Sequence, residues 1–178
     1  MKIYFLRHAK TDSNTKNRWQ GRGDLDLSNE GMEQLKQLAK QNYFFDVIFT
    51  SPTKRTLKTA CVFKNSNNFI ICDGRILERD FGNLESKEVQ EGEKEILSNW
   101  VLNTDLNQNV EKIQDMYYLR IKPFLLELKS EYNDSNKKIL IVSHSWVGRL
   151  ISFFSSKETK KELIAEAPIN AHIYEYEI

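Results

Sequence analysis

Short apolar runs recur along the chain and alternate with segments whose apolar positions follow a helical spacing. The runs at residues 3–6, 44–49, 69–72 and 139–142 have the length of strands that are buried in a sheet. The tail at residues 172–178 alternates apolar and polar side chains, which is typical of a half-exposed edge strand. Strands that alternate with helices favour a parallel sheet with right-handed crossovers. We therefore predict an α/β three-layer sandwich with a mostly parallel central sheet, helices on both faces and an antiparallel C-terminal edge strand.

Capping residues and periodic apolar positions place the helices between these runs. Ser28 can cap a first helix, and Ser51 with Pro52 indicates the cap and first turn of a second. The predicted inward faces of these helices are Met32, Leu35, Leu38 and Ala39, and then Thr56, Leu57, Ala60 and Cys61. A longer helix is expected over about residues 110–132, where Pro123 predicts a kink or a break. The inward face of a last helix is Trp146, Val147, Leu150, Ile151 and Phe154.

The charged stretch from residue 73 to about residue 109 interrupts the alternation of strands and helices. It is expected to contain a short helix at about 88–101, anchored by Trp100 and Val101. No linker or internal repeat divides the chain. We therefore predict a single domain over residues 1–178, with a small cap insertion at about 79–109.

The composition excludes several classes of partner. Lys and Arg number 26 against 25 for Asp and Glu, and a net charge of +1 indicates neither nucleic acid nor an anionic membrane as a partner. No apolar run is long enough to span a bilayer, and the N-terminal run is too short for a signal peptide. Cys61 and Cys72 fall on apolar patterns that predict buried, reduced thiols. We expect a cytoplasmic protein, and nothing in the sequence indicates its oligomeric state.

Charged and imidazole side chains stand where the predicted strands end. Arg7 and His8 follow the first strand, and alone they would simply mark its exit into solvent. Further candidates after the other strands are Arg55, Glu78 and His144. The carboxyl ends of parallel strands share one edge of the sheet, which is where such folds bind ligands. Two guanidiniums, two imidazoles and a carboxyl group at one edge suit a phosphate dianion, because arginine donors match phosphate oxygens in pairs.

The same residue types also suit phosphoryl transfer. A histidine can attack phosphorus and split hydrolysis into two easier steps. The leaving alkoxide then needs a proton, which Glu78 can supply if its surroundings raise its pKa. Asp73, Asp80 and Glu85 are the neighbouring alternatives for this carboxyl group.

Several motifs taken together resemble the histidine phosphatase superfamily, which contains cofactor-dependent phosphoglycerate mutases and many small phosphatases. The matching residues are Leu6-Arg7-His8 with Thr11 and Asn14; Gly21-Arg22-x-Asp24-x-x-Leu27-Ser28-x-x-Gly31-x-x-Gln34; Ser51-Pro52-x-x-Arg55-Thr56-x-x-Thr59-Ala60; Leu77-Glu78-x-x-Phe81-Gly82; and Val142-Ser143-His144. They run from the first strand to near residue 150 in the order and spacing of that family.

The resemblance implies a role for each matching residue. His8 would be the phosphorylated nucleophile and Glu78 the proton donor and acceptor. Arg7, Arg55 and His144 would bind the phosphoryl oxygens, with His144 cationic once the dianion is bound. The remaining implied contacts with the substrate or its phosphate are Asn14, Gln20, Gly21 and the backbone N–H of Ser145, where a helix begins. Neither a metal ion nor another cofactor is implied.

Four positions depart from the family pattern. Ala9 stands where glycine usually follows the nucleophile, and a positive φ there would strain alanine by about 1 kcal/mol. Lys10 replaces a residue that is often acidic, and Ser145 and Ser86 replace common glycines. None of these changes removes a catalytic group, so they bear on rate and substrate fit more than on reaction type.

Phosphatase and mutase share this machinery, and charge in the insertion separates them. A mutase must hold a second phosphate with extra cations. Between residues 84 and 106 the basic residues are Lys87 and Lys94, against Glu85, Glu88, Glu91, Glu93, Glu95 and Asp105. We therefore predict a metal-independent phosphomonoesterase. A phosphoglycerate mutase is the alternative, because cations outside this stretch could hold the second phosphate: Lys10, Arg18, Arg22 and Arg79. A phospho-ligand-binding pseudo-phosphatase is the non-enzymatic one, and a small phosphorylated molecule or a phosphoprotein would suit the same core.

Overall fold

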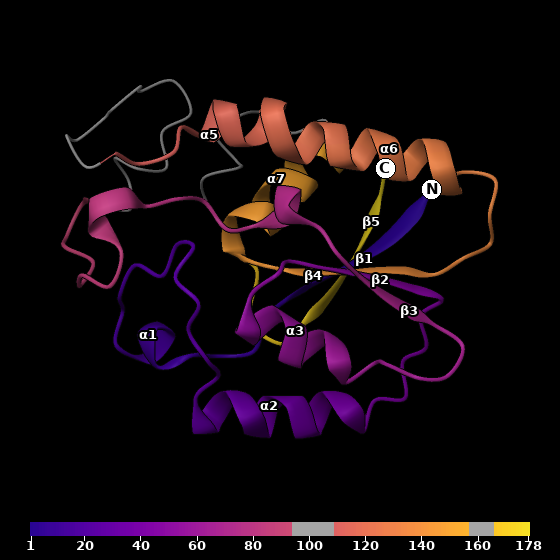
Figure 1. Ribbon diagram of the computed structural model, residues 1–178, viewed down its shortest axis with the longest axis horizontal. Coiled ribbons are helices and arrows are strands. Elements are labelled where there is room, and N and C mark those ends of the chain that lie inside the picture. The colour runs from indigo at the N-terminus through magenta and orange to yellow at the C-terminus, as the bar shows by residue number, and fades with distance from the viewer. Residues whose placement is uncertain (94–108, 157–165) are drawn as a thin grey trace.

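A computed structural model of the chain describes residues 1–93, 109–156 and 166–178. Five strands form one sheet in the order β3-β2-β4-β1-β5 (Figure 1). The strands are β1 (Lys2–Arg7), β2 (Val47–Thr50), β3 (Phe69–Cys72), β4 (Ile139–Ser143) and β5 (Ile173–Glu177). β1, β4, β2 and β3 pair in parallel, whereas β5 runs antiparallel to β1 at the edge. The predicted mostly parallel sheet with an antiparallel C-terminal edge strand is confirmed.

Helices cover both faces of this sheet, as the sequence predicts. The longer helices are α2 (Asn29–Ala39), α3 (Lys54–Cys61), α6 (Lys122–Tyr132) and α7 (Ser145–Ser155). The shorter ones are α1 (Asp12–Thr15), η1 (Gly74–Ile76), η2 (Gly82–Leu84), α5 (Ile113–Asp115) and the π-helical segment η3 (Met116–Ile121). In Figure 1, α2 and α3 lie below the sheet, and α6 and α7 lie above it.

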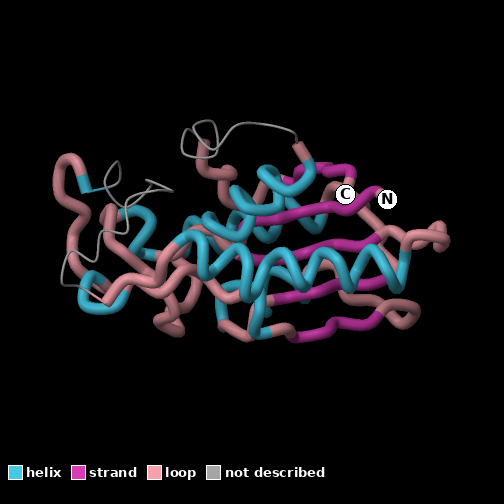
Figure 2. The backbone as a smooth tube through the Cα atoms, turned by 90° about the horizontal axis from the view of Figure 1, so that it is seen from above, coloured by secondary structure: helices cyan, strands magenta, loops and turns pink. Residues whose placement is uncertain are grey.

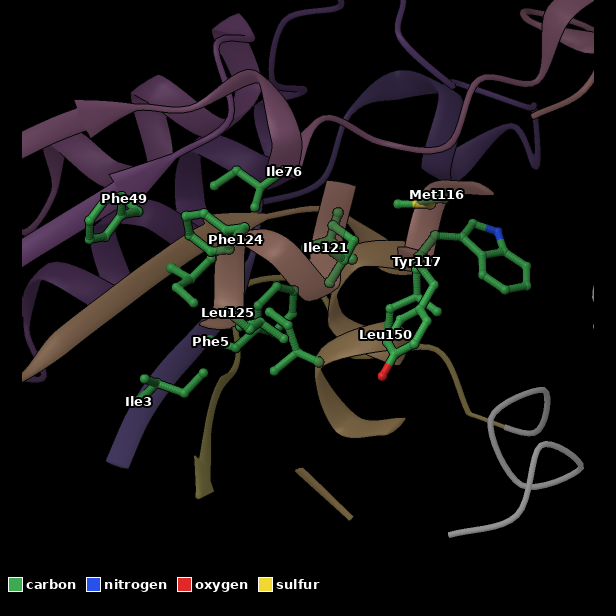
Figure 3. Close-up of a cluster of buried hydrophobic side chains, with 14 of the residues drawn as sticks. Ile3, Phe5, Phe49, Ile76, Met116, Tyr117, Ile121, Phe124, Leu125 and Leu150 are labelled. Atoms are coloured by element: carbon green, nitrogen blue, oxygen red, sulfur yellow. The ribbon is translucent and has the colours of Figure 1, made fainter. Parts of the chain in front are cut away.

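Alternation along the central strands divides the core into two layers. Phe5 of β1 packs with apolar residues of α6 and α7, including Phe124 and Leu150 (Figure 3). The next residue, Leu6, points to the other face and packs with residues of α2 and α3 such as Leu35. Successive side chains of a strand point to opposite faces, so a run that is apolar throughout is buried on both.

The carboxyl ends of the parallel strands are level with one another. Arg7 of β1 lies beside Ser143 of β4, and Thr50 of β2 lies between Val142 of β4 and Cys72 of β3. Loops and short helices gather beyond this end of the sheet (Figure 2). The segments that carry the predicted site residues therefore leave the sheet at one edge, as the parallel arrangement requires.

The predicted inward faces of α2 and α3 are partly wrong. Met32 and Ala39 are exposed, and α2 buries Gly31 with Leu35 and Leu38 instead. In α3, Leu57 is half-buried and Cys61 is exposed, while Arg55, Thr56, Thr59 and Ala60 are buried. Polar residues take part of the buried face of α3 because this helix packs against the loops of the site as well as against the sheet.

Both cysteines are exposed, which corrects the prediction of buried thiols. Cys61 is the last residue of α3, and Cys72 ends β3, an edge strand of the sheet. An apolar pattern therefore does not imply burial in β3, because one side of an edge strand has no neighbouring strand to cover it.

The cap predicted for α3 is also corrected. Thr53 is the N-cap residue and Lys54 begins the helix. The Ser51 hydroxyl instead lies 2.8 Å from Nε2 of His144. A serine before a proline suits a helix cap, but here a residue that is distant in the sequence competes for the hydroxyl.

The predicted long helix extends from Ile113 to Tyr132 through α5, η3 and α6. Residues Met116–Ile121, directly before the turn that contains Pro123, are π-helical. Proline has no N–H to donate and its ring crowds the preceding turn. The wider π-helical turn lets the helix continue past Pro123 where the sequence predicts a kink or a break.

Part of the predicted insertion lies in the described residues. There, residues 86–89 run beside residues 17–19: the N–H groups of Ser86, Trp19 and Val89 donate to the carbonyls of Trp19, Lys87 and Asn17. Most of the helix predicted at 88–101, with its anchors Trp100 and Val101, lies outside the described residues. That residues 79–109 act as a cap remains a prediction. Within the described residues, no helix is long and apolar enough to cross a membrane.

Candidate active site

A cavity of about 340 Å³ opens at the carboxyl ends of the parallel strands. Its size is that of a small-molecule site. Of the predicted site residues, those that line it are Arg7, His8, Asn14, Gln20, Gly21, Arg55, Glu78 and Ser145. The structure therefore gathers in one cavity nearly all the site residues that the sequence predicts.

His8 is buried, and its ring orientation is set by the adjacent backbone. Nδ1 lies 2.7 Å from the carbonyl oxygen of Ala9, so Nδ1 carries the proton and donates it. The lone pair of Nε2 is then available to an electrophile in the cavity. Burial lowers the pKa of His8 well below its usual 6.5, and the charges of Arg55 and Arg7 lower it further. His8 is therefore neutral at neutral pH, as a nucleophile must be.

His144 is fully buried and is not among the residues that line the cavity. Its ring is 5.3 Å from that of His8, centroid to centroid, in an edge-on arrangement. Nδ1 accepts from Nη2 of Arg55 at 3.3 Å, and Nε2 faces the Ser51 hydroxyl. Burial and the neighbouring arginines lower the pKa of His144 well below 6.5. Here His144 supports Arg55, and its predicted contact with phosphate stays a prediction.

The Arg55 guanidinium is held by backbone carbonyls of the loop that follows α1. Nη1 donates to Gly23 O at 2.5 Å and Nη2 donates to Gly21 O at 2.8 Å. Its Nε is buried and has no hydrogen-bond partner among the described residues. Burial lowers the pKa of Arg55, and the charge of Glu78 opposes that shift. A guanidinium fixed on one side by carbonyls can present its remaining donors to an anion.

Arg7 and His8 are held in place by a segment near the C-terminus. Nη1 of Arg7 donates to Pro168 O at 3.0 Å, and the Ala171 N–H donates to Arg7 O at 3.0 Å. Nδ2 of Asn170 donates to His8 O at 2.8 Å. These contacts fix the chain where it leaves β1, so the tail before β5 shapes the wall of the cavity.

Glu78 is buried and accepts two backbone hydrogen bonds. Oε1 accepts from the N–H of Arg79 at 2.9 Å and of Trp146 at 3.2 Å. Burial raises the pKa of Glu78, although these bonds and the charges of Arg7 and Arg55 oppose the shift. A carboxyl group whose pKa is raised by burial can hold a proton for a leaving group.

A second set of polar contacts fixes the loop that carries Glu78. Nη1 of Arg120 donates to the carbonyls of Arg75 and Leu77, and the Ser143 hydroxyl donates to Ile76 O at 2.6 Å. The guanidinium of Arg79 lies over the rings of Phe81 and Trp146. Burial lowers the pKa of Arg79 to about 10, so it stays cationic at neutral pH.

The side chains of Asn14 and Gln20 are oriented by Thr11. Oδ1 of Asn14 accepts from the Thr11 N–H at 3.0 Å, which forms a capping box at α1. Oε1 of Gln20 accepts from the Thr11 hydroxyl at 2.9 Å. Both amide oxygens are thus engaged, so each side chain can present its NH₂ group to an anion in the cavity.

The strain that a positive φ would cause at Ala9 does not arise. Ala9 is absent from the described residues that have a positive φ, and its N–H donates to the Thr59 hydroxyl at 3.1 Å. Ser86, which replaces a common glycine, does have a positive φ of 68°. The strain of about 1 kcal/mol therefore falls at Ser86, away from His8.

The alternatives to Glu78 have other partners. Asp73 pairs with Arg75 at 2.6 Å, and Asp80 accepts from the Gly82 N–H at 2.8 Å. Glu85 accepts hydrogen bonds from backbone N–H groups. Glu78 alone of these four carboxyl groups lines the cavity.

Four supporting residues were not predicted from the sequence. Thr59 binds the backbone N–H of Ala9, Ser51 binds His144, Asn170 binds His8 O, and Arg149 lines the cavity. Thr59 and Ser51 lie within the matching motifs, and this was a signal that they belong to the site. The sequence does not show which groups they bind. Asn170 forms a β-bridge with Arg7, and the sequence around it carries no local signal of this role.

No group of three or more His, Cys, Asp and Glu side chains in residues 1–93, 109–156 and 166–178 is arranged to hold a metal ion. The charged and amide donors among the lining residues include the guanidinium groups of Arg7 and Arg55, the ammonium of Lys10 and the amide groups of Asn14 and Gln20. Such groups bind anions rather than cations. A neutral imidazole, two arginines and a buried carboxyl group at one cavity can perform phosphoryl transfer.

Comparison with known proteins agrees with this chemistry. The family model described as "Histidine phosphatase superfamily (branch 1)" matches residues 3–173. The chain is 34% identical over 153 residues to Phosphoserine phosphatase 1 of Hydrogenobacter thermophilus, covering 82% of this chain and 71% of that protein. It is 31% identical over 103 residues to the 2,3-bisphosphoglycerate-dependent phosphoglycerate mutase of Nautilia profundicola, covering 53% of this chain and 45% of the mutase.

Solved structures share the fold. The alpha-ribazole phosphatase from Shigella flexneri superimposes with a TM-score of 0.83 at 22% sequence identity. The alignment covers 100% of this chain and 91% of that one. At this identity, the likeness extends to the fold and not to the substrate.

Proposed function

The chain belongs to the histidine phosphatase superfamily, and we propose that it hydrolyses small phosphomonoesters through a phosphohistidine at His8, without a metal ion. The observation that carries the proposal is the orientation of His8. Its Nδ1 is engaged by Ala9 O, so the lone pair of Nε2 is left for phosphorus. The relatives support the class, because they include a phosphatase and a mutase of this family.

In the first step, Nε2 of His8 attacks phosphorus and the bond from phosphorus to the ester oxygen breaks. The leaving oxygen takes the proton of Glu78, whose pKa is raised by burial. Arg7 and Arg55 neutralise the charge on the phosphoryl oxygens, with Asn14 as a neutral donor. Positioning and neutralisation are the main requirements of phosphoryl transfer.

In the second step, a water molecule attacks the phosphorus of phosphohistidine. The Glu78 carboxylate takes a proton from this water, and the bond from phosphorus to Nε2 breaks. Inorganic phosphate leaves, while His8 and Glu78 return to their starting states. The backbone bonds to Glu78 hold its carboxyl group in place for both transfers.

A phosphoglycerate mutase is the second candidate. The observation in its favour is that Lys10, Arg18 and Arg149 line the same cavity. Against it, two of the other candidate cations are already paired: Arg22 pairs with Asp80 and Glu111, and Arg79 donates to Glu111 O. A mutase would interconvert the two monophosphoglycerates and be stimulated by the bisphosphate, whereas the proposed phosphatase releases phosphate without such stimulation.

Phosphoserine is the first substrate to assay, because a relative with that activity in its name is 34% identical to this chain. We propose a cytoplasmic location, as the sequence predicts. The free thiols of Cys61 and Cys72 suit a reducing compartment.

The test is turnover of p-nitrophenyl phosphate by the wild type, His8→Ala and a control, His172→Ala. His172 lies near the C-terminus, where its ring contacts Tyr174. We expect His8→Ala to lose activity by at least about a thousandfold, since no other group can form the covalent intermediate, and His172→Ala to remain active.

The wild type should also carry acid-labile phosphate on His8 when the reaction is quenched. Wild-type turnover by His8→Ala would overturn the proposal. A stable phosphohistidine that is never hydrolysed would indicate the pseudo-phosphatase instead.

A further inference from the structure

Glu85 stands next to the cavity without lining it, and its carboxylate binds backbone N–H groups of a loop that is distant in the sequence. Oε1 accepts from the Arg22 N–H at 2.8 Å, and Oε2 accepts from the Gly23 N–H at 3.1 Å. Oε1 also accepts from the Phe81 N–H at 3.4 Å. Both carboxylate oxygens are therefore used to tie residues 21–23 to residues 81–85.

The same loop holds the phosphate-binding arginine. The carbonyls of Gly21 and Gly23 accept from Nη2 and Nη1 of Arg55. Glu85 accepts hydrogen bonds from the N–H groups of Arg22 and Gly23, and Arg55 donates hydrogen bonds to carbonyls of the same short segment. The orientation of these peptide groups therefore links Glu85 to the guanidinium.

The absence of a side chain at Gly21 leaves space for the Glu85 carboxylate. A Cβ atom added there would lie 1.8 Å from Oε1 of Glu85, and Gly21 has a φ of +53°. Only glycine accepts both the backbone conformation and the close approach of the carboxylate. The glycine of the Gly21-Arg22 motif thus makes room for Glu85.

We propose that Glu85 is a positioning residue that holds Arg55 in its phosphate-binding orientation through the backbone of residues 21–23. The inference rests on the proposed function only in taking Arg55 as a phosphate ligand. Glu85 does not touch the reacting atoms. It fixes the orientation of the Arg55 guanidinium before the substrate binds, so that less reorganisation is needed on binding.

The experiment is a double-mutant cycle between Glu85 and Arg55, with KM and kcat for p-nitrophenyl phosphate and the inhibition constant of inorganic phosphate as readouts. Glu85→Ala should raise KM and the phosphate inhibition constant at least tenfold. In an Arg55→Ala background, the same change should alter both by less than twofold, because its effect passes through Arg55. Glu85→Gln should give an intermediate loss, since its single amide oxygen can replace only part of the carboxylate.

Glu91→Ala is the matched control, since Glu91 is an exposed glutamate in the same segment. It should behave as the wild type. If Glu85→Ala does not fold, as judged by circular dichroism and thermal unfolding, Glu85→Gln takes its place in the cycle.

Two results would overturn the inference. One is a Glu85 variant within twofold of the wild type, and the other is an equal loss in both backgrounds, as a general destabilisation would give. An inactive wild type would instead refute the proposed function, and binding of inorganic phosphate measured by calorimetry would then still test the coupling of Glu85 to Arg55.

Discussion

Burial sets the protonation states of the side chains that would react. The pKa of His8 lies well below 6.5 and that of Glu78 lies above 4.5, in both cases chiefly because burial disfavours the charged form. Both shifts are in the direction that favours a neutral imidazole at His8 and a protonated carboxyl group at Glu78. Each shift follows from burial of the side chain rather than from the residue type.

Glu78→Gln separates proton donation from nucleophilic attack. The variant should lose about 10²- to 10⁴-fold in kcat/KM for an alkyl phosphate, whose leaving oxygen needs a proton. Its loss for p-nitrophenyl phosphate should be smaller, because nitrophenolate leaves unprotonated. Initial rates on both substrates, with Glu91→Gln as a control, provide the comparison. Equal losses on the two substrates would argue against Glu78 as the acid.

The same two groups predict the pH profile of wild-type kcat/KM for the alkyl phosphate. Activity should fall on the acid side as His8 protonates, at a pH below 6.5 because its pKa is lowered. It should fall on the alkaline side as Glu78 loses its proton, above 4.5. In Glu78→Gln the alkaline limb should disappear, and its persistence would assign that limb to another group.

Protonation of the buried histidines also links stability to pH. In the unfolded chain His8 and His144 protonate near 6.5, whereas in the folded protein their pKa values are well below it. As the pH falls through 6.5, the unfolded state binds more protons, so the free energy of unfolding decreases. The slope should reach about 1.4 kcal/mol per pH unit for each histidine.

Glu78 acts in the opposite sense at lower pH. Its folded pKa is raised, so its contribution to stability is present below 4.5 and is lost as the pH rises through the folded pKa. Urea unfolding between pH 5 and pH 8 measures the sum of these effects. His8→Asn should show a shallower slope below pH 6.5 than the wild type, and identical slopes would contradict the assignment.

At the scale of elements, helix α2 supports the site by binding the loop that follows His8. The Ser28 N–H and hydroxyl both donate to Lys10 O, and the Lys10 N–H donates to Oε1 of Gln34. The Ser28, Gly31 and Gln34 motif therefore fixes the backbone two residues after His8. Its role is to hold this loop, not to contact substrate.

Gly31→Ala tests this contact. A Cβ atom at position 31 would lie 2.0 Å from Lys10 O, which is backbone and cannot swing aside. We expect a loss of about 1–3 kcal/mol in the free energy of unfolding, despite the better helix propensity of alanine. Gly74→Ala is the control, because nothing lies within 4 Å of its added Cβ. Chemical unfolding of both variants provides the measurement, and equal stabilities would contradict the predicted clash.

At the scale of the whole molecule, the site is assembled from segments at both ends of the chain. Residues 168–171 bind Arg7 and His8, and α7 brings Trp146 to Glu78. The amino group of Met1 donates to Ile178 O at 3.1 Å, so the termini lie side by side. The cavity therefore depends on segments that are far apart in the sequence rather than on one loop.

Removal of metal ions should leave turnover unchanged within twofold. In the proposed mechanism, Arg7 and Arg55 supply the positive charge that a divalent ion supplies elsewhere. Hydrolysis of p-nitrophenyl phosphate after dialysis against EDTA, with and without added Mg²⁺, measures this. A loss that Mg²⁺ restores would show that the arginines are insufficient.

Most of the fold was predictable because the apolar runs of β1 and β4 carry a signal that does not depend on distant partners. The buried face of α3 was not fully predictable. Arg55 is buried there, and a pattern of apolar residues cannot predict a buried cation. The predicted burial of the Cys72 thiol was wrong for a related reason. An edge strand and a central strand can have the same composition, and only the strand order distinguishes them.

The sequence by itself determined the order of strands and helices along the chain and the residue types at each strand end. From these, Arg7, His8, Arg55, Glu78 and His144 could be assigned to one edge of a parallel sheet. Only the tertiary structure decided which partner each polar group takes. Ser51 binds His144 instead of capping a helix, and Glu85 binds the backbone that holds Arg55. Hydrogen-bond partners are settled by competition among groups from distant segments, and that competition exists only once the chain has folded.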